Sequence, residues 1–87
     1  MYSIISQYMN NLTKEKITQF AISKNITLSN EELDFTYKFV KKNWEKVLAN
    51  PNILKIDRYE KYYSKENYQK IKKLITEYQA RFQNYFW

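Results

Sequence analysis

Two long stretches of the chain repeat apolar residues every three or four positions, which is the spacing that lines one face of an α-helix. The stripe within residues 29–49 consists of Leu33, Tyr37, Val40, Trp44, Val47 and Leu48. The stripe within residues 65–85 consists of Tyr68, Ile71, Ile75, Tyr78, Phe82 and Tyr85. Because this spacing is unbroken in both stretches, we predict an all-α fold, a small bundle of three to four helices without a sheet. The core is predicted to centre on Leu33, Val40, Trp44, Ile71, Ile75 and Phe82.

Polar residues that can cap helices mark where the helices begin. Thr13 is a candidate N-cap for a helix over residues 14–24, which would bury Ile17, Phe20 and Ala21. Ser29 and Glu32 form a capping box before the first long stripe, and Ser64 precedes the second.

The remaining segments carry weaker signals. Residues 1–11 are expected to form a short helix or an arm, and residues 25–28 a short extended link. Residues 51–63 form either a turn of helix or a packed connector, in which Asp57 is a candidate cap. Pro51 ends the long helix before it. Since the chain has no glycine, asparagines are expected wherever the backbone needs a positive φ.

The length of 87 residues suits a single domain, so we expect residues 1–87 to form one helical domain. The first eleven residues do not resemble a secretory signal, and no apolar run approaches the roughly 18 residues of a membrane span. The absence of cysteine fits a reducing compartment. We therefore expect a cytoplasmic protein that does not enter a membrane.

The chain lacks the side chains on which most catalysis and metal binding depend. It has no histidine and no cysteine, and without glycine it has no glycine-rich phosphate loop. The densest carboxylate cluster, Glu31, Glu32 and Asp34, opens a helix, where the helix dipole favours negative charge. We expect no enzyme, no metal site and no small-molecule cofactor.

Positive charge is concentrated in the later part of the chain. The net charge is +6, yet residues 1–34 carry three basic and four acidic side chains, whereas residues 35–87 carry twelve and five. Such a basic segment attracts polyanions, and nucleic acid is the first partner to consider. Alternatively, a low-GC bacterial genome enriches lysine and tyrosine through codon usage alone.

One candidate binding surface is the second face of the helix over residues 29–49. Phe35 and Phe39 lie opposite the apolar stripe, on the same side as Lys38, Lys42 and Lys46. If exposed, this face is a candidate site for a protein partner or a second copy of the chain, formed by Phe35, Phe39, Lys42 and Lys46. The alternative is that both phenylalanines pack beneath a terminal helix.

A second candidate surface interleaves basic and aromatic residues, an arrangement that can hold a nucleic-acid backbone while stacking bases. Its members are Arg58, Tyr59, Lys61, Tyr62, Lys65 and Lys70. The alternative is an amphipathic connector with tyrosine rings turned inward and lysine stems lying over them. The apolar end, Tyr85, Phe86 and Trp87, either docks on the core or joins an interface.

The order of several short motifs also suggests a family. They are Asn11-Leu12-Thr13, a helix with Phe20, Ile26-Thr27-Leu28-Ser29, Asn52-Ile53-Leu54 and Leu74-Ile75-Thr76, with an aromatic near Phe82. Together they resemble a family of short Firmicute proteins, domain of unknown function 2624, over nearly the whole chain. The sequence departs from that pattern in its helical run through Glu77 and Tyr78 and in its many tyrosines. The resemblance implies a small helical bacterial protein and transfers no site residues.

Two hypotheses for function follow. The leading one is a non-catalytic protein-interaction or regulatory module, of the kind that a phage or mobile element encodes. The alternative is a nucleic-acid-binding module that uses the basic, tyrosine-rich surface.

Overall fold

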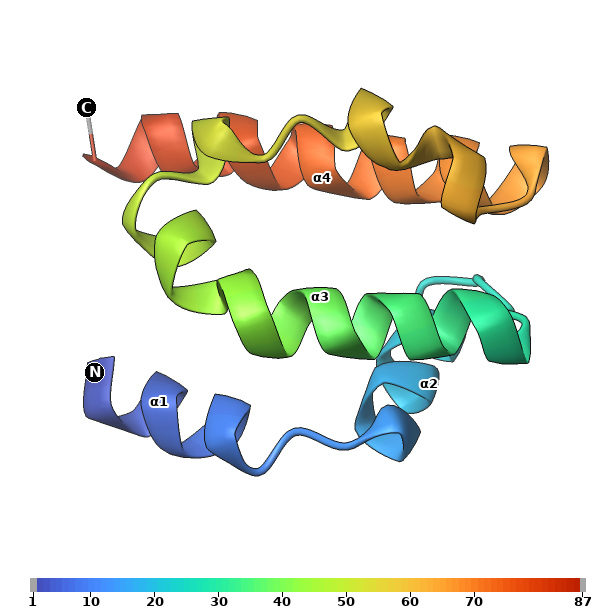
Figure 1. Cartoon of the computed structure of the whole chain (residues 1–87). Coiled ribbons are helices and arrows are strands. Elements are labelled where there is room, and N and C mark those ends of the chain that lie inside the picture. Colours follow the sequence, from blue (N-terminus) through green and yellow to red (C-terminus); the bar gives the residue numbers. More distant parts are fainter. Residues whose placement is uncertain (1, 87) are drawn as a thin grey trace. The chain divides into compact units, whose positions relative to one another are not determined.

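The computed structural model describes residues 2–86, with side chains described for residues 4–81. Within residues 2–86 every regular element is a helix and no strand occurs, which confirms the all-α fold (Figure 1). The elements are the α-helices α1 (Tyr2–Asn10), α2 (Lys14–Ser23), α3 (Asn30–Ala49) and α4 (Lys65–Phe86), and the 3-10 helices η1 (Pro51–Ile53) and η2 (Ile56–Tyr62). None of these described helices is both long enough and apolar enough to cross a membrane.

Backbone contacts divide the chain into two compact units, Met1–Glu45 and Lys46–Trp87. The first unit contains α1, α2 and most of α3, and the second contains the last residues of α3, both 3-10 helices and α4. The first eleven residues, expected to be a helix or an arm, contain α1. The expectation of one domain over residues 1–87 stays a prediction.

Polar caps begin the helices of the first unit as the sequence predicts. The Thr13 hydroxyl accepts a hydrogen bond of 3.2 Å from the Lys16 amide at the start of α2. At the start of α3, the Ser29 amide donates to Glu32 Oε1 at 2.8 Å, and the Glu32 amide donates to Ser29 Oγ at 3.1 Å. These reciprocal bonds confirm the capping box.

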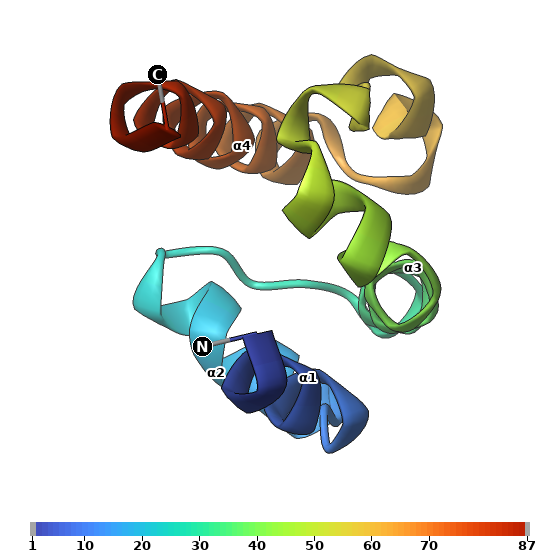
Figure 2. The same ribbon diagram turned by 90° about the vertical axis from the view of Figure 1, so that its left-hand side faces the viewer.

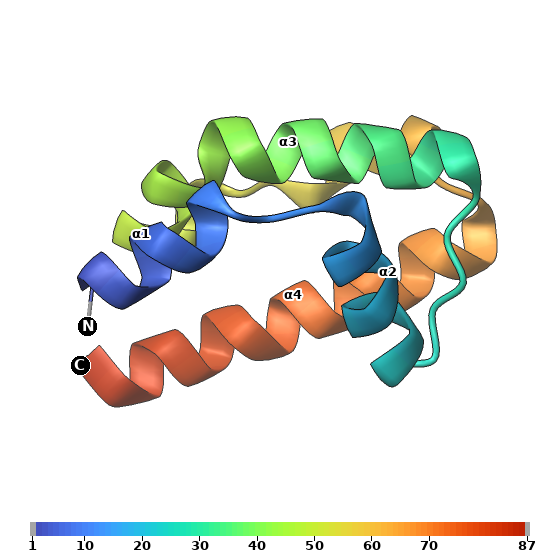
Figure 3. The same cartoon turned by 90° about the horizontal axis from the view of Figure 1, so that it is seen from below.

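Helix α2 ends in a tight turn that depends on an asparagine. Asn25 has a φ of 61°, the positive φ expected of an asparagine in this glycine-free chain. The Ile26 amide donates to the Ala21 carbonyl at 2.8 Å, and the Asn25 amide donates to the Ile22 carbonyl at 2.9 Å. This is the Schellman pattern, and it leads the chain into the extended link before α3 (Figure 3).

The first unit buries a small cluster of apolar side chains from its short elements. These are Leu12, Ile17, Ala21 and Ile26. The predicted burial of Ile17 and Ala21 is confirmed, whereas the predicted burial of Phe20 is wrong, because its side chain is 54% exposed. The buried face of α2 is formed by Ile17 and Ala21, one turn apart, and Phe20 lies about 100° around the helix from Ala21.

In the second unit both 3-10 helices pack against α4, beside which they curl in Figures 1 and 2. The Asn50 side chain caps η1, and the ring of Pro51 is fully buried. Gln79 of α4 donates from Nε2 to the carbonyls of Pro51 and Leu54, at 2.9 and 3.3 Å. These bonds join residues at least 25 positions apart and hold the connector against the helix.

The predicted centre of the core requires correction. Leu33, Val40, Trp44, Ile71 and Ile75 are all half-buried, and Phe82 lies outside the described side chains. The buried apolar residues of the second unit, among the described side chains, are Pro51 and Tyr68. An apolar stripe shows which side of a helix turns inward, but the depth of burial depends on what covers that side.

Replacing Ile26 with alanine is expected to destabilise the protein by about 2–5 kcal/mol, because it removes buried methylene groups and leaves a cavity. Ile26 is 4% exposed, whereas Ile22, at the other end of the same turn, is 60% exposed. Ile22→Ala is therefore the matched control and should change stability by less than about 0.5 kcal/mol. Urea unfolding followed by circular dichroism measures both. Equal effects would contradict this assignment of the core.

Candidate functional sites

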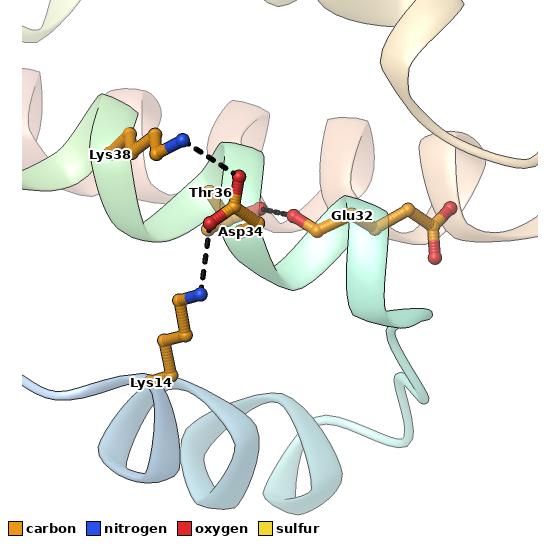
Figure 4. A network of polar contacts seen from close by, with 5 residues as sticks. All are labelled: Lys14, Glu32, Asp34, Thr36 and Lys38. Atoms are coloured by element: carbon orange, nitrogen blue, oxygen red, sulfur yellow. Dashed lines mark hydrogen bonds and ion pairs between the residues drawn. The ribbon is translucent and has the colours of Figure 1, made fainter.

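A polar network ties α2 to the first turns of α3 (Figure 4). Asp34 forms ion pairs of 2.9 Å with Lys14 and 3.0 Å with Lys38, one turn further along α3. Hydrogen bonds from Lys14 and then Lys38 lower the pKa of the Asp34 carboxyl. Lys38, which the sequence placed beside the two phenylalanines, is therefore engaged by an aspartate of its own helix.

Two of the three carboxylates at the start of α3, Glu32 and Asp34, have structural partners. Glu32 is buried and caps Ser29, and Asp34 holds the two lysines. Among the described residues, no three acidic side chains gather as a metal site would require. The hydrogen bond between Glu32 and the Ser29 amide agrees with the prediction that Glu32 belongs to a capping box.

A lysine of α3 binds the end of α1, an interaction that the sequence pattern did not reveal. Lys41 Nζ donates to the carbonyls of Met9 and Asn10, each at 3.1 Å. The last carbonyls of a helix lack partners within the helix, and a cation at that end is favoured by the helix dipole. Local spacing carried no signal for a contact between residues more than 30 positions apart.

The first candidate surface lies partly in the first unit. Phe35 and Phe39 are both half-buried, with ring centroids 6.0 Å apart and planes tilted by 35°. The side chain of Lys42 is exposed on the same side of α3. Lys46 is also exposed, but it lies in the last turn of α3 and belongs to the second unit. Neither alternative for the phenylalanines is met in full, since they are neither buried nor freely exposed.

The second candidate surface lies entirely within the second unit, on η2 and α4. A hydrogen bond from the Tyr68 hydroxyl to Asp57 Oδ1 joins the two helices. Lys72 adds an ion pair of 3.3 Å to the same oxygen. The prediction that Asp57 caps a short helix is wrong, because η2 has Lys55 at its N-cap position and no side-chain cap. The Asp57 carboxylate instead reaches across to α4.

The network between Asp57 and Tyr68 shifts the pKa of both groups. Hydrogen bonds from Tyr68 and then Lys72 lower the pKa of the Asp57 carboxyl. The hydrogen bond to Asp57, followed by burial, raises the pKa of the Tyr68 hydroxyl to about 12. Both shifts favour a protonated phenol beside an ionised carboxylate, which is the pair that makes this bond.

The tyrosines of the second candidate surface differ in exposure. Tyr59 and Tyr63 are half-buried and Tyr68 is buried, whereas Tyr62 is 44% exposed. Lys61 Nζ lies 5.4 Å from the centroid of the Tyr62 ring. The inward-facing alternative therefore describes most of these rings, and Tyr62 is the exception.

The basic residues are exposed at the junction of η2 and α4. Arg58, Lys61 and Lys65 are exposed, and none of the described carboxylates forms an ion pair with them. Lys70 is half-buried, and it lies about 140° around α4 from Lys65 at 100° per residue. Lys73 lies about 80° from Lys65 and is exposed, so it fits this surface better than Lys70. The helical angle, available from the sequence, distinguishes these two lysines.

The two units differ in charge. The first carries six basic and five acidic side chains, and the second carries nine and four, a net charge of +5. Nearly all of the net charge of +6 thus belongs to the unit that contains η2 and α4.

No family model, curated protein or solved structure matches the chain. The resemblance to domain of unknown function 2624 therefore stays a prediction.

Replacing Tyr68 with phenylalanine should lower the melting temperature, with a characteristic pH dependence. The raised pKa of Tyr68 means that its contribution is complete below about pH 10 and is lost as pH rises toward 12. The lowered pKa of Asp57 means that its contribution is present above about pH 4 and is lost on further acidification. The difference in melting temperature between wild type and Tyr68→Phe should thus be constant from about pH 5 to about pH 9. It should shrink at lower and at higher pH. A difference independent of pH would contradict the hydrogen bond.

Proposed function

We propose that the protein is a non-catalytic, cytoplasmic nucleic-acid-binding module whose contact surface is the junction of η2 and α4. The observation that carries the proposal is the exposure of Arg58, Lys61, Lys65 and Tyr62 on η2 and at the start of α4, with none of the described carboxylates paired to the three cations. Cations and an exposed ring on adjoining elements match the phosphates and bases of a nucleic acid. The half-burial of Phe35 and Phe39 leaves the other candidate surface with less support.

The distribution of charge supports the proposal over codon usage. A low-GC genome raises the lysine content of the whole chain, yet the excess of basic over acidic residues is one in the first unit and five in the second. Both arginines of the sequence, Arg58 and Arg81, also lie in the second unit. The lysines themselves number six and seven in the two units, so the difference in charge comes mainly from the two arginines, which a low-GC genome does not favour, and from one fewer acidic residue in the second unit.

Replacing Arg58 or Lys65 with alanine should weaken binding to mixed oligonucleotides and flatten its dependence on salt. Each phosphate contact contributes a log–log slope of about −0.7 for single strands and −0.9 for duplexes, so each variant should reduce the slope magnitude by about that amount. Fluorescence anisotropy at several salt concentrations measures the slope.

Lys24→Ala is the matched control, because Lys24 is an exposed lysine of the first unit. It should leave both affinity and slope nearly unchanged. A slope that falls equally in Lys24→Ala would mean that only net charge matters. Failure of the wild type to bind at about 50 mM salt, where phosphate contacts are strong, would contradict the proposal.

A second candidate function is protein interaction or self-association through α3. It is favoured by the paired rings of Phe35 and Phe39 beside the exposed Lys42. Partly exposed aromatic rings beside a cation are common in protein interfaces. A second copy of the chain is the simplest partner to test.

Replacing both Phe35 and Phe39 with serine should convert a self-associated wild type into a folded monomer. Sedimentation velocity measures the association state, and thermal unfolding shows whether the fold survives. Phe20→Ser is the control, because Phe20 is an exposed phenylalanine of another helix. A monomeric wild type, or a double variant that unfolds, would contradict self-association through this surface.

A further inference from the structure

We infer that the junction of η2 and α4 selects single-stranded over double-stranded nucleic acid, with the Tyr62 ring as a stacking platform. This inference rests on the proposed function and adds the class of ligand. A surface that held only phosphates would need cations but no exposed ring. The faces of bases are available for stacking in a single strand, whereas in a duplex they are covered by their neighbours.

The position of Tyr62 distinguishes it from the other tyrosines of the junction. It is the last residue of η2, and only Tyr63 and Ser64 separate it from Lys65 at the start of α4. The Lys61 ammonium group lies 5.4 Å from the ring centroid. A nucleotide presents a base together with a phosphate, so a ring that lies between two lysines in sequence can meet both parts at once.

The anchoring of η2 to α4 gives this platform a defined place. Asp57, five residues before Tyr62, is bound by both Tyr68 and Lys72 of α4. Lys72 is two turns after Lys65, about 20° away around the helix and about 10 Å along it. The carboxylate of Asp57 therefore secures η2 beside the side of α4 that carries Lys65, so the two elements that carry the Tyr62 ring and the cations are held together.

The site is tested with fluorescent single strands of DNA and RNA and with a duplex of matched length. Tyr62→Ala should weaken single-strand binding by about 5- to 150-fold, the range for loss of one stacking aromatic. Tyr62→Phe should retain most of the affinity, because stacking needs the ring and not the hydroxyl. Neither variant should change the salt slope, since no phosphate contact is removed. Comparison of the DNA and RNA strands shows which sugar the site prefers.

Tyr78→Ala is the matched control. Tyr78 is 46% exposed, almost the same as Tyr62, but it lies on α4 about 140° around the helix from Lys65. This variant should bind as the wild type does. If single strands and duplex bind equally, or if Tyr62→Ala and Tyr78→Ala behave alike, the stacking inference is overturned while phosphate binding stands. If no oligonucleotide binds, the proposed function itself fails.

Discussion

The hydrogen bond from the Tyr68 hydroxyl to the Asp57 carboxylate is the central contact between η2 and α4, the two elements that carry the candidate nucleic-acid surface. A 3-10 helix has weaker internal hydrogen bonds than an α-helix and is rarely longer than a few residues. The 3-10 helix η2 nevertheless spans seven residues, has no side-chain cap and buries none of its residues fully. Its position must therefore come from side chains that reach α4. Because a buried tyrosine hydroxyl needs a hydrogen-bond partner, Tyr68 and Asp57 stabilise each other's placement.

Asp34 in the first unit and Asp57 in the second unit play parallel roles. Asp34 binds lysines from α2 and α3, and Asp57 binds a tyrosine and a lysine from α4. Each thereby uses one carboxylate to join two helices. Four of the six lysines in the first unit are engaged by Asp34 or by carbonyls at or just after the end of α1, namely Lys14, Lys16, Lys38 and Lys41. In the second unit Asp57 engages Lys72, and the basic residues that remain exposed include Arg58, Lys61, Lys65 and Lys73.

The sequence predicted the helix ends well because capping is local. Thr13, Ser29 with Glu32, and the asparagine turn all involve residues at most five positions apart. The contacts that assemble each unit join distant residues, as in Lys41 to the end of α1, and no local pattern encodes them. Asp57 shows the difference clearly, because its position after a break favours a cap, yet its partners lie 11 and 15 positions ahead. For the candidate site, charge and composition located the segment, but they did not reveal that only Tyr62 among its tyrosines is well exposed.

The size of the candidate surface constrains how it would work. With three phosphate contacts to a single strand, a slope of about −0.7 per contact implies roughly a 20-fold loss of affinity between 50 and 200 mM salt. A stacking ring offsets part of this loss, since base stacking does not depend on counterion release. If two such surfaces bound the same strand, they would offset more of the loss of affinity in salt, because the second surface would meet the strand at a high effective concentration. Self-association through Phe35 and Phe39 would supply that second surface. The two proposed functions therefore do not exclude each other.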